Sequence, residues 1–250
     1  MKASPAGTAG CRRVSVNAIA DAFILALNLI ATGDGNLWEI VGLSLEVTLT
    51  AVAIACLIGL PLGGMLAIVR FPGRNAVIVA LNALMGLPPV VAGLTVYLLL
   101  SRAGPLGVLE LLYTPAAMIL AQVVLVTPIV AALGRQVVAD MHQEYDEQLR
   151  SMGVSALGAV PTLLYDARHS LMTVALAGLG RAIAEVGAVI MVGGNINHVT
   201  RVMTTTIALE TSKGNLALAM ALGMILMALA LTVNAAVMGL RPRFEGVRHA

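Results

Sequence analysis

Charged and aromatic residues are scarce in this sequence. Of its 250 residues, 11% are charged and 3% are aromatic, whereas about a quarter of the residues in soluble domains are charged. A formal net charge of +2 is too small for a phosphate-binding surface, and so few rings offer no platform for base stacking. The composition therefore predicts no nucleic-acid partner and argues against an ordinary soluble domain.

Motifs for catalysis and for metal binding are also missing. The histidines are scattered along the chain, at His142, His169, His198 and His249. The two cysteines, Cys11 and Cys56, lie far apart, so neither a disulfide framework nor a thiolate metal site is expected. No Gly-x4-Gly-Lys-Ser/Thr phosphate loop occurs. We therefore expect no catalytic residue, no metal site and no cofactor bound by this chain. Any energised work must draw on another chain or on an ion gradient.

Apolar residues are abundant, at 59% of the chain with a mean hydropathy of +0.93. A bilayer core requires about 20 apolar residues per helix. The segments that meet this length are Ile40–Val69, Ala76–Leu100, Pro115–Val138, Leu171–Val192 and Leu216–Leu240. We therefore predict an all-α, polytopic helical membrane protein with five core transmembrane helices.

A sixth segment, Val14–Ala31, is borderline. Asn17, Asp21 and Asn28 fall on one helical face within it, which fits an interfacial helix and a packed spanning helix equally well. We divide the chain into an N-terminal tail with this helix (residues 1–37), a transmembrane core (38–240) and a C-terminal tail (241–250).

The distribution of basic residues favours six spans. If all six segments cross and the stretch Asp140–Arg168 is cytoplasmic, the basic residues left outside are Arg102, Arg201 and Lys213. If the first segment does not cross, the basic residues before Val14 also move outside and the bias weakens. The positive-inside rule therefore predicts a multi-pass protein with both termini in the cytoplasm.

The stretch Asp140–Arg168 is the one long, densely charged interruption between the apolar segments. Its first part has helical spacing, and Gly153 suits the left-handed conformation in which helices often end. Ser155 then suits the cap of a second short helix, which Pro161 should limit to its first turns. We expect a helix, a sharp turn and a second helix on the cytoplasmic face. Spacing alone leaves open whether this element binds a partner or is a solvated connector.

Arg181 and Glu185 are ionisable residues inside a predicted span. They lie four positions apart and therefore share one helix face. Ionisable residues at membrane depth usually face a cavity or each other. An internal ion pair that fixes helix packing is the favoured interpretation, because such a pair lacks the net charge that anion binding requires. The alternative is that Arg181 also offers positive potential to an anion in transit.

Pro88 and Pro89 interrupt the predicted span Ala76–Leu100. Two prolines remove two backbone donors, and irregular backbone at membrane depth occurs only where protein or a water-filled cavity covers it. With the preceding Asn82 and Gly86, they form either a static kink or part of a transport pathway or gate. Glu46, in another span, is open to the same two interpretations, and a paired structural acid is favoured.

The predicted outer loop, Gly193–Gly214, is polar and mildly basic. Asn195, Thr200 and Arg201 are candidates for contact with a soluble binding protein. The loop could equally be solvated with no partner.

Several stretches resemble ABC-importer permease subunits. Glu147-x5-Gly153, followed by a short apolar segment, resembles their "EAA" loop, although Gln148 and Leu149 stand where the family has alanines. Three further stretches resemble the oxyanion branch of that family, the last of them most closely its tungstate-type members: GLPPVVAGL (86–94), GRAIAEVGA (180–188) and TTIALETSKG (205–214). The resemblance covers roughly Leu29 to Leu240.

This resemblance implies a permease subunit that is not itself an enzyme. It implies a homodimer among the lipids of the cell inner (cytoplasmic) membrane. It also implies cytoplasmic ATPase subunits that bind ATP and Mg, and a periplasmic or extracellular oxyanion-binding protein. Tungstate is the expected cargo, moved by alternating access, with molybdate or sulfate as alternatives. A gradient-driven transporter or channel is the alternative from another class.

The resemblance also implies that the segment Ser155–Leu164 is the coupling helix that docks on the ATPase. Its departures from the family are Ala156, Gly158 and Pro161, where many relatives carry basic, polar or aromatic residues. The predicted coupling residues are Glu147, Gly153, Ser155, Leu157, Val160 and Leu163.

Overall fold

The computed structural model describes residues 23–25, 27, 28 and 35–239, and these contain helices and turns but no strand. The predicted all-α fold is thereby confirmed. The segment Val14–Ala31 lies largely outside the described residues, and the tail 241–250 lies wholly outside them.

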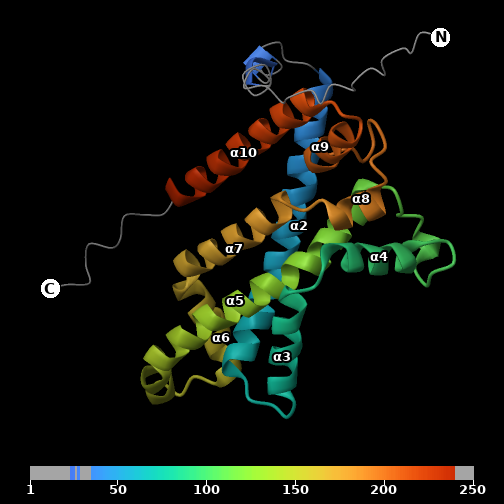
Figure 1. Ribbon diagram of the computed structural model, residues 1–250. Helices are drawn as coiled ribbons and strands as arrows, with labels where there is room; N and C mark the ends of the chain where they lie inside the picture. Colours follow the sequence, from blue (N-terminus) through green and yellow to red (C-terminus); the bar gives the residue numbers. More distant parts are fainter. Residues whose placement is uncertain (1–22, 26, 29–34, 240–250) are drawn as a thin grey trace, which may run out of the picture.

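Two long helices form the centre of the molecule (Figure 1). They are α2 (Gly35–Ile68, 34 residues) and α5 (Pro115–Ser151, 37 residues). Glycine lets them approach closely, since a Cβ atom on Gly63 of α2 would overlap the carbonyl oxygen of Ala131 in α5. Small residues at such a crossing allow two membrane helices to pack backbone against backbone.

Two of the predicted spans are broken rather than continuous. The interruption of the first at Pro88 and Pro89 was predicted, whereas the break in the second corrects the sequence-based prediction. In place of Ala76–Leu100, α3 (Arg74–Met85) and α4 (Pro89–Leu100) meet at a bend of 105°. In place of Leu171–Val192, α7 (Arg168–Ile183) and α8 (Gly187–Gly193) meet at 59°. The first break follows from the two prolines, with Pro89 opening α4 at a position where its missing N–H costs nothing.

The described residues contain three helices long and apolar enough to cross a membrane, or up to five if each bent pair is one span. The upper value agrees with the five predicted core helices. A short 3-10 turn, η1 (Gly107–Leu109), and the extended chain around it connect α4 to α5.

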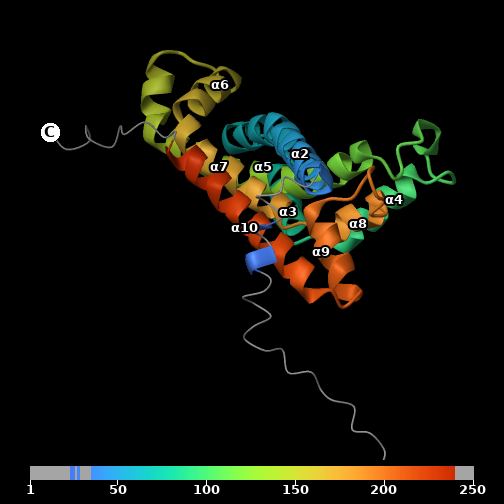
Figure 2. The same ribbon diagram turned by 90° about the horizontal axis from the view of Figure 1, so that it is seen from above.

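The last two helices cover one side of this bundle. The short α9 (Met203–Ser212) packs against the start of α10 (Leu216–Gly239), and both pack on α2 through Leu37, Val41 and Leu222. In Figure 2, α10 lies beside α7 along the outside of the molecule.

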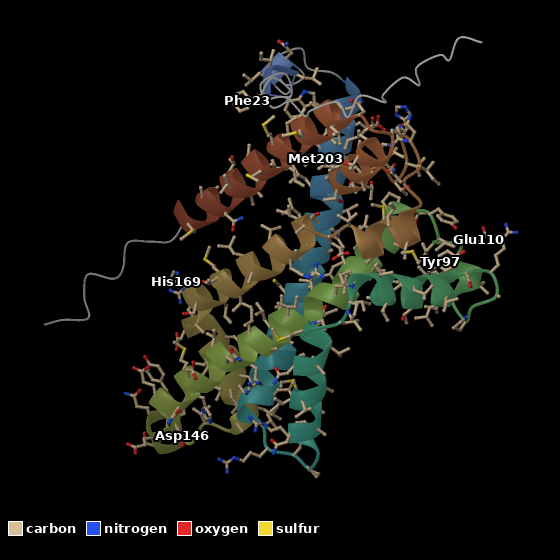
Figure 3. All side chains as sticks on the ribbon, viewed as in Figure 1. Phe23, Tyr97, Glu110, Asp146, His169 and Met203 are labelled. Atoms are coloured by element: carbon tan, nitrogen blue, oxygen red, sulfur yellow. The ribbon has the colours of Figure 1, made fainter. Side chains whose placement is uncertain are left out.

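The charged stretch extends a membrane helix instead of starting a loop. Helix α5 continues beyond the predicted end at Val138 to Ser151, and α6 (Ala156–Asp166) follows after a sharp turn. Gly153 has a φ angle of +69°, and the Ser155 hydroxyl accepts the Gly158 N–H at 3.2 Å, so the predicted turn and cap are confirmed. We call residues 151–157 the α5–α6 corner; Asp146 marks the approach to it in Figure 3.

The expectation that Pro161 restricts the second helix to its first turns was wrong. Helix α6 is 11 residues long and contains Pro161. A proline in this position removes one backbone hydrogen bond. The helix continues past it because Val160 and Leu163, on either side, are buried in a cluster with Ile68, Val138 and Leu149.

Candidate functional site

The break between α7 and α8 is organised by Glu185. Its Oε2 accepts a hydrogen bond from Nη1 of Arg181 at 2.6 Å, and its Oε1 accepts the Ala188 N–H at 2.9 Å. The Glu185 side chain is 3% exposed, whereas that of Arg181 is 31% exposed. The carboxylate is thus neutralised by α7 and at the same time caps the start of α8, which supports the packing interpretation of this pair.

Neighbouring helices donate hydrogen bonds to backbone carbonyls at the break, and the Ala182 carbonyl also accepts the Glu185 N–H at 3.2 Å. Gln122 of α5 donates from Nε2 to the Ala182 oxygen at 3.4 Å, and Thr204 of α9 donates from Oγ1 to the Glu185 oxygen at 3.0 Å. Gln122 is buried, and its Oε1 has no hydrogen-bond partner among the residues that the structure describes. The sequence analysis missed both residues. An amide set among apolar residues in the first half of the segment Pro115–Val138 was the signal that could have identified Gln122.

A small cavity lies beside this break, enclosed by α2, α5, α7, α8, α9 and α10. Most of its lining is apolar, and its polar groups are contributed by Ser44, Thr48, Gln122, Glu185 and Thr204. Hydroxyl and amide groups can hydrogen-bond an oxyanion or water. The one carboxylate in the lining is already paired with Arg181, so the cavity carries no unbalanced charge from this ion pair.

The two breaks are packed against each other through α4 and α8. A Cβ atom on Gly93 would lie 2.7 Å from Cα of Ala188, and one on Gly187 would lie 3.0 Å from Cγ2 of Val90 and 3.6 Å from Cβ of Pro89. Of the pathway candidates, Pro89, Arg181 and Glu185 are therefore brought together.

The remaining pathway candidates are exposed residues on the surface of the single chain. Asn82, Gly86 and Pro88 are exposed on α3 and at its C-terminal end. Glu46 is exposed on α2, and it has no ion-pair partner among the described residues, contrary to the expected structural pairing.

The loop between α8 and α9 is held by internal hydrogen bonds. Thr200 is fully buried; its hydroxyl donates to the Gly193 oxygen and accepts the Ile196 N–H. It therefore shapes the loop and cannot face a binding protein, which corrects its assignment. Asn195 is half-buried and accepts a hydrogen bond from Thr205 at 2.9 Å.

The remaining loop candidate, Arg201, is half-buried and donates to Asn197 at 2.8 Å. The neighbouring His198 lies 2.8 Å from Glu39 and ties the loop to the start of α2. The sequence analysis did not foresee this pair, because the two residues are far apart in the chain.

The turn from α9 to α10 carries a second buried carboxylate. Glu210 accepts hydrogen bonds from Lys213 at 2.8 Å and from Asn215 at 3.1 Å. These bonds, that of Lys213 foremost, hold the pKa of the Glu210 carboxyl below its ordinary value, and burial opposes them. These hydrogen bonds hold the end of α9 against the start of α10.

At the opposite end, the predicted coupling residues divide into two groups. Glu147, Gly153, Ser155 and Leu157 are exposed, with Leu157 at 62%. Val160 and Leu163 are 7% and 1% exposed, because they anchor α6 to α2 and α5. As apolar docking contacts these two were wrongly chosen: helical spacing identified the apolar face but not the chain that covers it.

The exposed large apolar residues of the α5–α6 corner are Met152, Val154 and Leu157, at 68%, 37% and 62%. Sequence reasoning found only Leu157. A charged stretch that ends in an apolar corner outside the membrane helices offers a contact surface for another protein.

These features define an all-α multi-pass membrane protein. Two broken helices meet beside a small cavity with a few polar groups in a mostly apolar lining, as is common where membrane proteins transport a solute. A helical corner projects from one end (Figure 3).

Comparison with known proteins identifies the family. No protein-family model matches the chain. It is 40% identical over 226 residues to a probable anion ABC transporter permease protein of Haloferax volcanii, covering 87% of this chain and 97% of that protein. It is 37% identical over 223 residues to the tungstate uptake system permease protein TupB of Peptoclostridium acidaminophilum, covering 89% and 98%. The sulfate transport system permease protein CysT of Salmonella typhimurium is more distant, at 27% over 210 residues, covering 80% and 76%. The chain therefore belongs to the ABC transporter permeases, in their oxyanion branch, as the sequence motifs predicted.

Proposed function

We infer that this chain is the membrane subunit of an ATP-driven importer for an oxyanion, with tungstate as the cargo. The observation that carries this inference is its identity with tungstate uptake permeases over most of both chains, at 37% and 35%. The sulfate permease is less similar, at 27%, which favours tungstate over sulfate. Molybdate remains the nearest alternative by its chemistry. Family membership also favours ATP-driven transport over the gradient-driven alternative.

The α5–α6 corner supports a separate ATPase subunit as the source of energy. Its apolar residues Met152, Val154 and Leu157 are exposed, and the backbone there is fixed by Gly153 and by the Ser155 cap. A partner that binds ATP and Mg would dock on this corner, with Glu147 beside it. The permease itself then makes and breaks no covalent bond.

Helix α5 offers a route from this corner to the helix break. The same continuous helix carries the corner at Ser151 and the amide of Gln122, which holds the Ala182 carbonyl. The two positions are separated by about 44 Å at a rise of about 1.5 Å per residue. Movement of the corner on ATP binding would be transmitted as a rigid-body shift of α5 against α7, which is one form of alternating access.

The ion pair between Arg181 and Glu185 suits the passage of an anion rather than its tight binding. A free guanidinium at membrane depth would bind an oxyanion tightly and slow its release. Because Glu185 balances the charge of Arg181, the remaining recognition would come from neutral donors, namely the Thr48 hydroxyl and the second N–H of the Gln122 amide. The hydroxyls of Ser44 and Thr204 already donate to the carbonyls of Ile40 and Glu185. Specificity is then left to a binding protein that delivers the anion to the outer loop.

A second copy of the chain is the expected partner within the membrane. Apolar side chains on α3 and α4 are exposed in the single chain: Val79, Leu84, Val90, Val91, Leu94 and Leu98. These residues flank the Gly86–Pro88 break, whose uncovered backbone requires protein or water beside it at membrane depth. A homodimer would supply that cover and enclose the pathway between its subunits.

The test is uptake by cells that express the chain with an ABC ATPase and an oxyanion-binding protein encoded beside it. Cellular tungsten is measured at limiting external tungstate, with molybdate and sulfate as competitors. We expect uptake that requires all three proteins and that molybdate inhibits more than sulfate does. Uptake that persists without the ATPase would contradict the proposal, and so would uptake of sulfate in preference to tungstate.

A further inference from the structure

A second, larger groove lies on the outside of the bundle, between α2, α6 and α7. Its walls are almost wholly apolar. Their shape is set by Ala53, Leu57 and Pro61 of α2, Leu164 of α6 and Met172 of α7, and its one charged lining residue is Arg168. Leu57 is 76% exposed in this chain, so the groove opens outward rather than into the bundle.

The groove extends over most of the depth of one membrane leaflet. On α7 it extends from Arg168 to Ala175, about 11 Å along the helix at about 1.5 Å per residue. Half of a bilayer hydrocarbon core is about 15 Å thick. Arg168 is the first residue of α7, where the chain turns from α6 into the membrane, and its neighbour His169 marks that end in Figure 3. The charged end of the groove thus lies at the level of lipid headgroups, and its apolar length lies at the level of acyl chains.

Arg168 is held in position but its charge is not balanced. Its guanidinium stacks on the Tyr165 ring, with Cζ 4.5 Å from the ring centroid, and Nη1 donates to the Tyr165 carbonyl at 3.0 Å. Within the part of the chain that the structure describes, no acidic side chain forms an ion pair with it. The remaining N–H donors are free for a planar or tetrahedral anion, and guanidinium groups bind phosphate in a two-pronged arrangement.

We propose that this groove binds an anionic phospholipid, with an acyl chain along α2 and α7 and the headgroup phosphate on Arg168. The occupant must be apolar over the depth of one leaflet and negatively charged at its surface, and an anionic lipid of that leaflet meets both conditions. A zwitterionic lipid matches the apolar wall but brings no net charge to Arg168. One arginine near an anionic surface contributes about 1 kcal/mol, so the preference over a zwitterionic lipid is about five-fold. The bound lipid would brace α2 against α7 next to the α6 junction.

The proposal does not depend on the transported substrate or on the ATPase, so lipid binding is measured directly. The full-length chain is reconstituted with Trp38→Phe, which removes its one tryptophan, and Leu57→Trp, which places a reporter at the groove mouth. Quenching of the tryptophan fluorescence by brominated phosphatidylglycerol is compared with its quenching by brominated phosphatidylcholine. Leu231→Trp in the same background is the matched control, because Leu231 is 66% exposed on α10, outside the groove, and α10 itself has no basic residue.

We expect phosphatidylglycerol to occupy the Leu57→Trp site about five-fold better than phosphatidylcholine, and the Leu231→Trp site with no preference. Arg168→Gln should abolish the preference and Arg168→Lys should largely retain it. Equal quenching by both lipids at Leu57→Trp, or a preference that survives Arg168→Gln, would overturn the proposal. Absence of quenching by either lipid would also overturn it, because the groove would then be filled by protein.

An independent measurement avoids the tryptophan substitutions. Phospholipid that copurifies with the unmodified chain is extracted and quantified, and Arg168→Gln is compared with it. The substitution is at an exposed side chain, so the fold should persist, as the elution volume in detergent verifies. We expect the copurified anionic lipid to fall while the zwitterionic lipid is unchanged. An unchanged anionic fraction would contradict the proposal.

Discussion

Gly93 of α4 and Ala188 of α8 are in backbone contact: a Cβ atom on Gly93 would lie 2.7 Å from Cα of Ala188 and 3.1 Å from its carbonyl oxygen. Each residue follows a helix break, one made by prolines and the other by Glu185. The contact therefore locks together the two irregular segments of the bundle.

The first prediction concerns this contact. Gly93→Ala should lower the unfolding temperature in detergent, because overpacking against rigid backbone typically costs about 1–3 kcal/mol. Gly180→Ala is the matched control, since a Cβ atom on Gly180 meets nothing within 4 Å. The control should match or slightly exceed the wild type in stability, since alanine favours helix. Equal unfolding temperatures for the two variants would show that the α4–α8 contact is not tight.

The second prediction uses the unequal burial of the ion pair. Arg181→Gln leaves the buried Glu185 carboxylate without its partner, a change that costs about 3–5 kcal/mol at such sites. Glu185→Gln leaves an arginine that is 31% exposed and reaches solvent, and its amide oxygen still accepts the Ala188 N–H. We expect Arg181→Gln to be the more destabilising, and the double variant to recover part of the loss.

Unfolding temperature and the yield of folded protein measure this asymmetry. If Arg181→Gln folded and unfolded like the wild type while transport was lost, the arginine would serve the anion pathway and the packing interpretation would be wrong.

The third prediction is a pH dependence at the α9–α10 turn. Hydrogen bonds from Lys213 and Asn215 lower the pKa of Glu210 in the folded protein. A lowered pKa contributes stability that is fully present above the ordinary glutamate value of about 4.3 and is lost as pH falls through the folded-state value. Glu210→Gln should therefore be less stable than wild type at neutral pH, with the difference closing in acid. A difference that stays constant with pH would contradict this linkage.

The fourth prediction concerns the α5–α6 corner. Gly153 has a φ of +69° and a Cβ atom there would meet open space, so Gly153→Val strains the backbone without a clash. A left-handed conformation costs roughly 1–2 kcal/mol for such a residue, whereas asparagine adopts it readily. We expect Gly153→Val to remain in the membrane but to uncouple ATP hydrolysis from uptake, and Gly153→Asn to retain coupling. Full uptake by the valine variant would exclude a role for this corner in coupling.

Local sequence signals were sufficient for the corner. Gly153 and Ser155 act on backbone within a few residues, so the turn and cap could be predicted without knowledge of the rest of the fold. The Pro88–Pro89 break could be located in the same way, although not its angle of 105°.

Features that depend on other helices could not be predicted. The break at Glu185 contains no proline, and it is stabilised by Gln122 and Thr204 from elsewhere in the chain. Val160 and Leu163 have the spacing of an apolar face, but the sequence does not say that α2 and α5 cover it. The burial of Thr200 depends likewise on a loop closed by its own hydrogen bonds.

Tungstate accumulation in sealed vesicles tests the central claim most directly. The vesicles contain the chain with its ATPase, the binding protein and tungstate are supplied on the side of the outer loop, and ATP is supplied on the side of the α5–α6 corner. The proposed function predicts accumulation that requires ATP, the ATPase and the binding protein together. Tungstate entry into vesicles that contain this chain alone, without ATP, would contradict it.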